Sequence, residues 1–138
     1  MNTTDRTPAF FNQWGQGRLP GLLGVDILEV ASGRLRARLE VRPELLAPNG
    51  FLHAGTVVAL ADTCAGYGCI ASLPEGVSSF ATLDLTSSFL GTARSGVIIA
   101  EALLRHGGRT TQVWDVTVAS EESKKVLALF RCTQFLLK

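Results

Sequence analysis

Cysteine and histidine are scarce in this chain of 138 residues. The three cysteines, Cys64, Cys69 and Cys132, form no CxxC pair, and with only His53 and His106 beside them the chain offers no ligand set typical of zinc. All three cysteines lie in apolar runs, where a free cysteine behaves as a small hydrophobic residue. We therefore expect no metal site, and a reducing cytoplasm is the location that fits this cysteine usage best.

Charge of either sign is also low. Charged residues make up 18% of the chain and the formal net charge is +1, so the composition gives no attraction to nucleic acid or to an anionic membrane. Neither is expected as a partner, and an anionic ligand would have to be held by local basic residues. The N-terminal sequence MNTTDRTPAFF lacks the basic start and apolar core of a signal peptide. We see no repeats, linkers or low-complexity segments, which favours a single domain over residues 1–138.

What the chain does contain is a long apolar run over residues 49–72, in which Asp62 is the only formally charged residue. The run has no polar face at helical spacing, so it predicts a helix over about 53–72 that is buried on all sides. Its small residues and the aspartate argue against a membrane span. Burying a lone carboxylate is costly and raises its pKa, and such positions often carry chemistry. Asp62 is therefore the candidate functional centre, with a structural carboxylate bonded to backbone amides as the alternative.

Alternating apolar and polar residues predict strands on both sides of this helix, as in GRLRARLEV at 33–41. The N-terminal extension, residues 1–20, is expected to contain a short helix over 7–18. Hairpin spacing makes the sheet antiparallel, and an apolar helix needs cover. We predict an α+β fold in which a curved antiparallel sheet of about six strands wraps one long central helix, with a second subunit on the remaining exposed face. The strands are expected at 23–30, 34–41, 77–89, 96–105, 109–120 and 125–137.

Taken in order, these segments resemble a known family. The motifs are HAG followed by TVVALADT (53–63), TLDLTSSFL (82–90), EALLRHGGRTTQVWDV (101–116) and KVLALFRCTQFLL (125–137). Over residues 22–137 the chain resembles the hotdog-fold acyl-CoA thioesterases, of the phenylacetate-pathway and hydroxybenzoyl-CoA thioesterase type. The most specific feature is a His-Gly-Gly signature with an acidic residue nine positions after the histidine. His53 and Asp62 keep that spacing, with Ala54 in place of the first glycine.

The resemblance implies an enzyme that hydrolyses a CoA thioester with an aromatic or short acyl group, in the catabolism of aromatic compounds. Coenzyme A is then part of the substrate, and no separate cofactor is implied. The family also implies a homo-oligomer, with a dimer as its minimal unit and a dimer of dimers (a homotetramer) as the expected assembly. Two alternatives stay open: a hotdog hydratase or dehydratase acting on an enoyl or hydroxyacyl thioester, and a non-catalytic acyl-CoA-binding sensor.

By position, the resemblance gives Asp62 the role of nucleophile or general base at the thioester carbonyl. The carbonyl oxygen would be bound by the backbone N–H of Ala54, with Gly55 beside it. Unpaired N–H groups and the positive end of the helix dipole suit a developing oxyanion there. Thr82 matches a strand hydroxyl that reaches from the facing subunit to orient the water, although it could equally be a hydroxyl bonding across strands. Asn49 stands in for an amide side chain that many relatives carry slightly earlier.

His53 has two interpretations, a general base or a residue that orients the loop, and we favour the second because the family places its chemistry on the carboxylate. Relatives hold the CoA phosphates with basic and hydroxyl residues on outer strands and turns. Arg109 and Thr110, at a predicted hairpin turn, match such positions, and Arg94 and Arg105 are further candidates. A solvated hairpin end is the alternative for Arg105 and Arg109.

Overall fold

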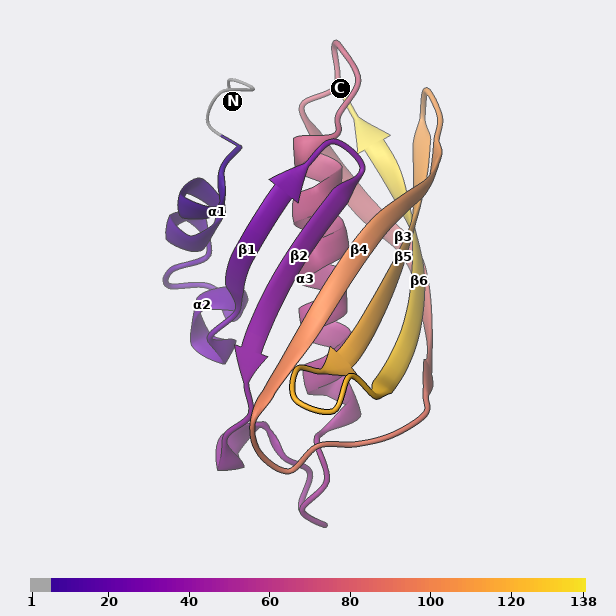
Figure 1. Ribbon diagram of the computed structural model, residues 1–138. Coiled ribbons are helices and arrows are strands. Elements are labelled where there is room, and N and C mark those ends of the chain that lie inside the picture. The colour runs from indigo at the N-terminus through magenta and orange to yellow at the C-terminus, as the bar shows by residue number, and fades with distance from the viewer. Residues whose placement is uncertain (1–5) are drawn as a thin grey trace.

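A single long helix, α3 (Ala54–Ala71), runs through the centre of the computed structural model, which describes residues 6–138 (Figure 1). A six-stranded antiparallel sheet curves around it in the order β1-β2-β4-β5-β6-β3. The predicted α+β arrangement, a curved antiparallel sheet around one long helix, is confirmed, and the first five residues of the predicted extension lie outside the described residues. The strands are β1 (Asp26–Ala31), β2 (Arg34–Glu40), β3 (Ser79–Phe89), β4 (Val97–Gly107), β5 (Thr111–Ser120) and β6 (Val126–Leu137).

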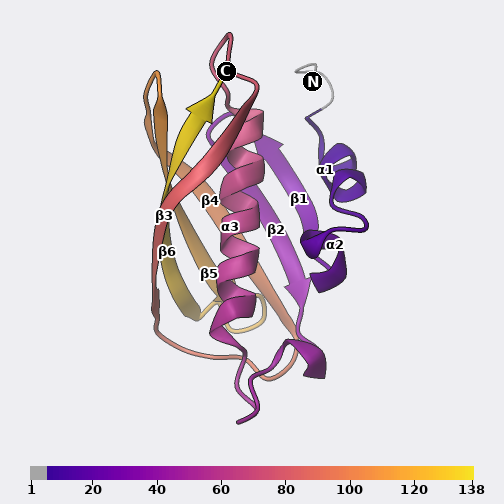
Figure 2. The same cartoon turned by 180° about the vertical axis from the view of Figure 1, so that it is seen from behind.

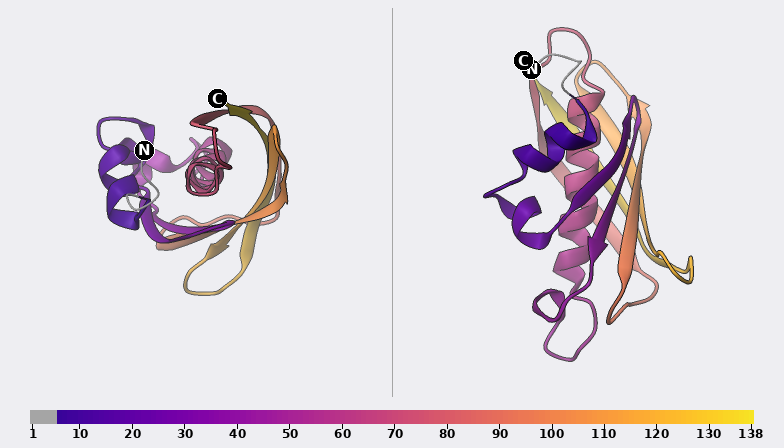
Figure 3. Two further views of the ribbon diagram at one scale, coloured as in Figure 1. Left: turned by 90° about the horizontal axis from the view of Figure 1, so that it is seen from above. Right: turned by 60° about the vertical axis from the view of Figure 1, so that its left-hand side comes forward.

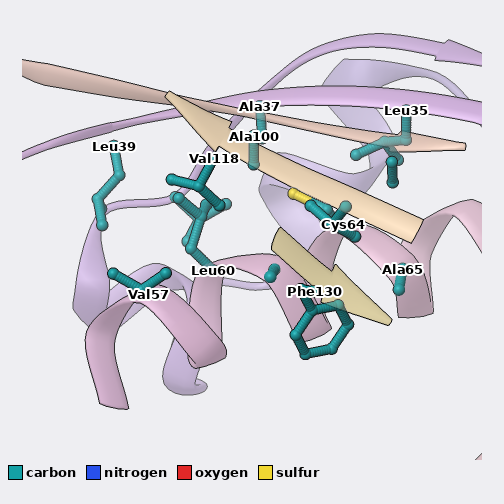
Figure 4. Close-up of a cluster of buried hydrophobic side chains, with 14 of the residues drawn as sticks. Leu35, Ala37, Leu39, Val57, Leu60, Cys64, Ala65, Ala100, Val118 and Phe130 are labelled. Carbon is teal, nitrogen blue, oxygen red and sulfur yellow. The ribbon is translucent and has the colours of Figure 1, made fainter. Parts of the chain in front are cut away.

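The inner side of α3 packs on the sheet in one apolar core. The length and apolar composition of α3 would let it cross a membrane, but 56% of it is buried inside the protein. Leu60 and Cys64 are fully buried and point at the strands, and Val57 lies one turn before Leu60 (Figure 4). The side chains that they meet in this cluster come from several strands, and include Leu35, Ala37, Leu39, Ala100, Val118 and Phe130.

Two glycines in α3 let the sheet approach the helix closely. A Cβ atom at Gly68 would lie 2.7 Å from the ring of Trp114, and one at Gly66 would lie 2.8 Å from the ring of Phe80. Glycine costs about 1 kcal/mol relative to alanine inside a helix. The close packing of two aromatic rings on the helix backbone is what keeps these residues small.

The opposite side of α3 is not covered. Val58, Ala59, Asp62 and Thr63 are only partly buried, and their spacing places them on one helix face. Seen from behind, α3 lies in front of the strands (Figure 2), and seen from above the sheet curls around one side of the helix only (Figure 3, left). The predicted burial on all sides is therefore wrong for the single chain, because the sheet does not close around the helix. We call the partly buried residues the open face of α3.

Two short helices precede the sheet, where the sequence predicted one helix over 7–18. The first, α1 (Pro8–Trp14), ends before two glycines, and a second helix that was not predicted, α2 (Leu19–Leu23), follows it. Gly24 ends α2 in the left-handed region at φ 85°. Arg42 donates hydrogen bonds of 2.7 and 2.6 Å to the carbonyls of the last two residues of α2. This distant arginine satisfies carbonyl groups that a helix end leaves without partners.

The two edges of the sheet differ. At the β1 edge, the Asn12 side chain of α1 accepts a hydrogen bond from the Ile27 N–H at 2.8 Å and donates one to the Ile27 carbonyl at 3.2 Å. At the other edge, β3 is paired on one side only, with β6, and its apolar side chains reach solvent. The exposed large apolar residues on β3 are Leu83, Leu85 and Phe89. An edge of this length with apolar side chains is a ready template for another strand.

Candidate active site

Asp62 lies midway along α3, on its open face. The carboxyl group is partly buried, and the Thr82 hydroxyl donates a hydrogen bond of 3.5 Å to its Oδ1. Burial raises the pKa of the Asp62 carboxyl, while the smaller effect of the Thr82 hydrogen bond lowers it. The carboxylate can thus be reached from the open face, and its raised pKa makes it a better proton acceptor than an ordinary aspartate.

Thr82 belongs to β3 of the same chain as Asp62. A β-bulge falls between Thr82 and Asp84, and Phe80, on the same strand face as Thr82, covers Gly66 one helical turn after Asp62. The sequence prediction had Thr82 reaching across from a facing subunit. The structure instead places this hydroxyl on the carboxylate of its own chain.

The start of α3 holds the amides that the sequence singled out. His53 is the N-cap, and its Nδ1 accepts the Gly55 N–H at 2.7 Å, so this amide is already engaged. The carbonyl of His53 accepts the N–H groups of Thr56 and Val57. No acceptor is found for the Ala54 N–H among the described residues, which leaves it the available donor at the positive end of the helix. His53 therefore caps the helix start, an arrangement that fits the structural one of its two interpretations.

Asn49 and Arg94 lie near this helix start. The Asn49 Oδ1 accepts the Phe51 N–H at 3.3 Å and so organises the turn that leads into α3. The Arg94 guanidinium stacks on the Phe51 ring, 4.6 Å from its centroid. Leu52 is tied to the segment before Arg94 through the Thr92 hydroxyl at 3.0 Å. Asn49 thus supports the loop, and Arg94 is the basic candidate that lies close to the helix N-terminus.

The other predicted CoA-binding residues lie elsewhere in the chain. Arg105 is paired with Asp115 at 3.0 Å on the outer face of the sheet, and Arg131 binds the same carboxylate at 2.6 Å. The Arg131 hydrogen bond, followed by that of Arg105, lowers the pKa of Asp115. Arg109 and Thr110 lie in the β4–β5 turn, at the end of the molecule opposite the start of α3 (Figure 1). The four residues therefore do not form one site within a single chain.

One polar residue near Asp62 was missed by the sequence analysis. Gln134 is fully buried on β6, where it faces the helix between Cys132 and Leu136. It is the direct cross-strand partner of Thr82. The sequence contained a signal for this residue. The alternation in FRCTQFLL places the glutamine on the inward face of the strand, where the other side chains are apolar.

Comparison with protein-family models matches residues 49–127 to the family described as Thioesterase superfamily. The chain belongs to this superfamily. It is 32% identical to the 1,4-dihydroxy-2-naphthoyl-CoA hydrolase of Listeria monocytogenes over 80% of this chain and 89% of that protein. It is 33% identical to the acyl-coenzyme A thioesterase PaaI of Escherichia coli over 79% of this chain and 75% of that protein.

Solved thioesterase structures share the fold. A thioesterase from Haemophilus influenzae superposes with a TM-score of 0.89 at 30% identity, covering 96% of this chain and 91% of its own. The Escherichia coli PaaI protein from the phenylacetic acid degradation operon superposes with a TM-score of 0.82 at 26% identity, covering 91% and 88%. The resemblance drawn from the sequence is confirmed: this is a hotdog-fold thioesterase, a thioester hydrolase of the acyl-CoA thioesterase group.

Within one chain of this thioesterase, the amide and the carboxylate of the candidate site lie apart. Eight residues separate Ala54 from Asp62, which corresponds to about 12 Å along a helix that rises 1.5 Å per residue. A carbonyl oxygen must lie about 3 Å from its N–H donor, with the attacking group at similar range of the carbonyl carbon. The Ala54 N–H and the Asp62 carboxylate of one chain therefore do not meet at the same thioester.

Proposed function

We propose that this thioesterase hydrolyses aromatic or short-chain acyl-CoA thioesters to the free acid and coenzyme A, with Asp62 as general base or nucleophile. The observation that carries the proposal is the Asp62 carboxylate, which is partly buried, bonded to Thr82 and exposed on the open face of α3. Acyl-CoA substrates fit the names of two relatives, and an aromatic acyl group fits the naphthoyl-CoA hydrolase. The reaction needs water and no further cofactor, because coenzyme A is part of the substrate.

In the general-base route, Asp62 accepts a proton from water as the water oxygen bonds to the carbonyl carbon. The Ala54 N–H of a second subunit stabilises the charge on the carbonyl oxygen, the C–S bond breaks, and the proton passes to the departing sulfur. In the nucleophilic route, an Asp62 carboxylate oxygen bonds to the carbonyl carbon and the C–S bond breaks, which leaves a mixed anhydride and releases the coenzyme A thiolate, protonated by water. Water then hydrolyses the anhydride to the free acid and the Asp62 carboxylate. A single turnover in oxygen-labelled water separates the two, since label in the enzyme carboxylate is expected only from the anhydride.

We further propose that each site is shared between two subunits, so that a homodimer is the minimal active unit. The distance between Ala54 and Asp62 within one chain supports this, as does the apolar β3 edge. A two-fold axis beside β3 would pair the two β3 strands and set the two α3 helices antiparallel. The helix start of one subunit would then face the open face of its partner's α3. A dimer of dimers is the assembly expected above this unit.

The direct test is the Asp62→Asn variant, which keeps the size of the side chain and removes its basicity. We expect turnover to fall by at least roughly 10²-fold, the scale of a lost acid–base group, with the fold intact. Release of free thiol is measured on a panel of phenylacetyl-, benzoyl- and acetyl-CoA, with kcat/KM compared across the panel. Asp84→Asn is the matched control, since Asp84 is exposed on the same strand as Thr82. Near-normal turnover of Asp62→Asn would rule out the proposed role of this carboxylate.

A further inference from the structure

Gln134 is a buried polar side chain that the fold does not account for. The residue is 0% exposed, and its Oε1 has no hydrogen-bond partner among the described residues. Its Nε2 has only a contact of 3.5 Å with the sulfur of Cys132. A buried polar atom without a partner destabilises a fold by about 1–3 kcal/mol, so such atoms are rare unless they have another role.

The neighbouring glutamine shows what a structural amide looks like here. Gln112 lies directly across from Gln134 on β5 and is also buried. Its Oε1 accepts the indole N–H of Trp114 at 2.8 Å, and its Nε2 donates to the Ser72 carbonyl at 3.0 Å. Both ends of the Gln112 amide are therefore used, and they tie β5 to the end of α3.

On its other side, Gln134 adjoins the catalytic candidates. It is paired with Thr82 across β3 and β6, and paired residues project from the same face with Cβ atoms about 4.5–5.5 Å apart. The Thr82 hydroxyl donates to Asp62. Burial raises the pKa of Cys132 to about 12, and the nearby Asp62 carboxylate adds to that shift. The amide, the thiol, the hydroxyl and the carboxylate thus form one small polar cluster beneath the open face of α3.

We infer that Gln134 is a positioning residue that holds the Thr82 hydroxyl in the direction that donates to Asp62. The inference rests on the proposed function, because it gives Gln134 a part in the chemistry assigned to Asp62. A hydroxyl has one hydrogen and two acceptor lone pairs, so an amide N–H placed on the oxygen leaves the hydrogen aimed at the carboxylate. No direct hydrogen bond joins Gln134 and Thr82 among the described residues, so we place one ordered water between the amide and the hydroxyl.

The role requires the Gln134 amide to be turned by a half-turn from the orientation in which its Nε2 contacts Cys132. This half-turn about the last side-chain bond exchanges the amide oxygen and nitrogen and leaves the shape of the side chain almost unchanged. With the oxygen toward Cys132, the amide accepts the S–H group, which stays protonated because the pKa of this thiol is raised. The NH₂ group then faces Thr82. Both ends of the buried amide acquire a use, which the Gln112 comparison shows to be the normal state of such a group.

The test compares Gln134→Met with Gln112→Met in the full-length enzyme. For Gln134→Met we expect kcat to fall about tenfold or more, the effect of a loosened catalytic group, with KM and Tm close to those of the unsubstituted enzyme. For Gln112→Met we expect the reverse, a lower Tm and an unchanged kcat per folded molecule, because Trp114 and the Ser72 carbonyl lose their partners. Equal losses of Tm and activity in Gln134→Met would make Gln134 structural and overturn the inference.

A pH profile and a double substitution test the route through Thr82. The hydrogen bond from Thr82 lowers the pKa of Asp62, so loosening it moves the acid limb of kcat/KM to higher pH in Gln134→Met. In a Thr82→Val background, Gln134→Met should cause no further loss of kcat, whereas independent losses that multiply would refute the route. If Asp62→Asn keeps its turnover, the proposed function itself fails. If Asp62→Asn is inactive and Gln134→Met keeps the original kcat and pH profile, only the role of Gln134 fails.

Discussion

Replacing Ala54 by proline would remove one backbone hydrogen and little else. Ala54 is the first residue of α3, a position where proline is favoured because its N–H has no acceptor within the helix. His53 has φ −64° and ψ 132°, a conformation compatible with a following proline. We therefore expect Ala54→Pro to fold normally and to be at least as stable as the unsubstituted chain, since a proline that fits the backbone stabilises by about 0.4–1 kcal/mol through the unfolded state.

The expected effect on catalysis is large. Loss of one oxyanion donor lowers kcat by about 10²–10³-fold, or about 2.7–4 kcal/mol in transition-state stabilisation. The assay is thiol release from a CoA thioester at saturating substrate, with Tm measured in parallel. Ala54→Val is the matched control, since it adds similar bulk and keeps the N–H group. If Ala54→Pro keeps most of its kcat, or if proline and valine reduce it equally, the Ala54 amide is not the carbonyl donor.

The same variant tests whether the site is shared between subunits. When Ala54→Pro and Asp62→Asn chains pair at random, about half of the dimers contain one of each, and each of these has one intact site out of two. Mixing the two inactive variants should therefore restore roughly one quarter of the activity of the unsubstituted enzyme. A site contained within one chain predicts no recovery at any mixing ratio, which would refute the shared arrangement.

Two further predictions concern stability and assembly. Because the pKa of Asp62 is raised from 3.8 in the folded state, its contribution to stability is complete below that value and is lost as pH rises through the raised pKa. Asp62→Asn should therefore have the higher Tm at neutral pH and lose that advantage near pH 4, whereas a constant difference across the range would contradict the burial argument. Leu85→Asp, on the β3 edge, should shift sedimentation toward the monomer and lower activity with it, while Leu22→Asp, at a more exposed apolar position on α2, should do neither. A Leu85→Asp variant that stays fully assembled would exclude the β3 edge as the dimer contact.

The features that were predictable from the sequence depend on local patterns. The apolar run defined α3 to within one residue, and the alternation in strands such as β2 gave their positions and inward faces. The spacing of His53 and Asp62 is also local, since it needs only a helix between them. These features arise from periodicity and capping, which neighbouring residues determine.

The features that were missed depend on contacts between distant segments. The helix α2 contains a proline and a glycine, which are typical of turns, and it is stabilised by Arg42, which lies about 20 residues away. The sequence predicted that Arg105 could bind a CoA phosphate. In the folded sheet it lies beside Asp115 and forms an ion pair with it. The contact of Thr82 with its own Asp62 depends on how β3 lies across α3, which no local pattern determines.

The hydrogen bonds from Asn12 to β1 have a consequence for how large the assembly can grow. A sheet with two unprotected edge strands could add subunits at both edges, and the product would be an open-ended fibre. Here the Asn12 side chain occupies the N–H and carbonyl groups of Ile27 that another strand would use at the β1 edge. Further strands can therefore be added only at the opposite edge of the sheet. In the proposed dimer, pairing along β3 therefore ends strand addition at two subunits, and a dimer of dimers would have to form through a different surface.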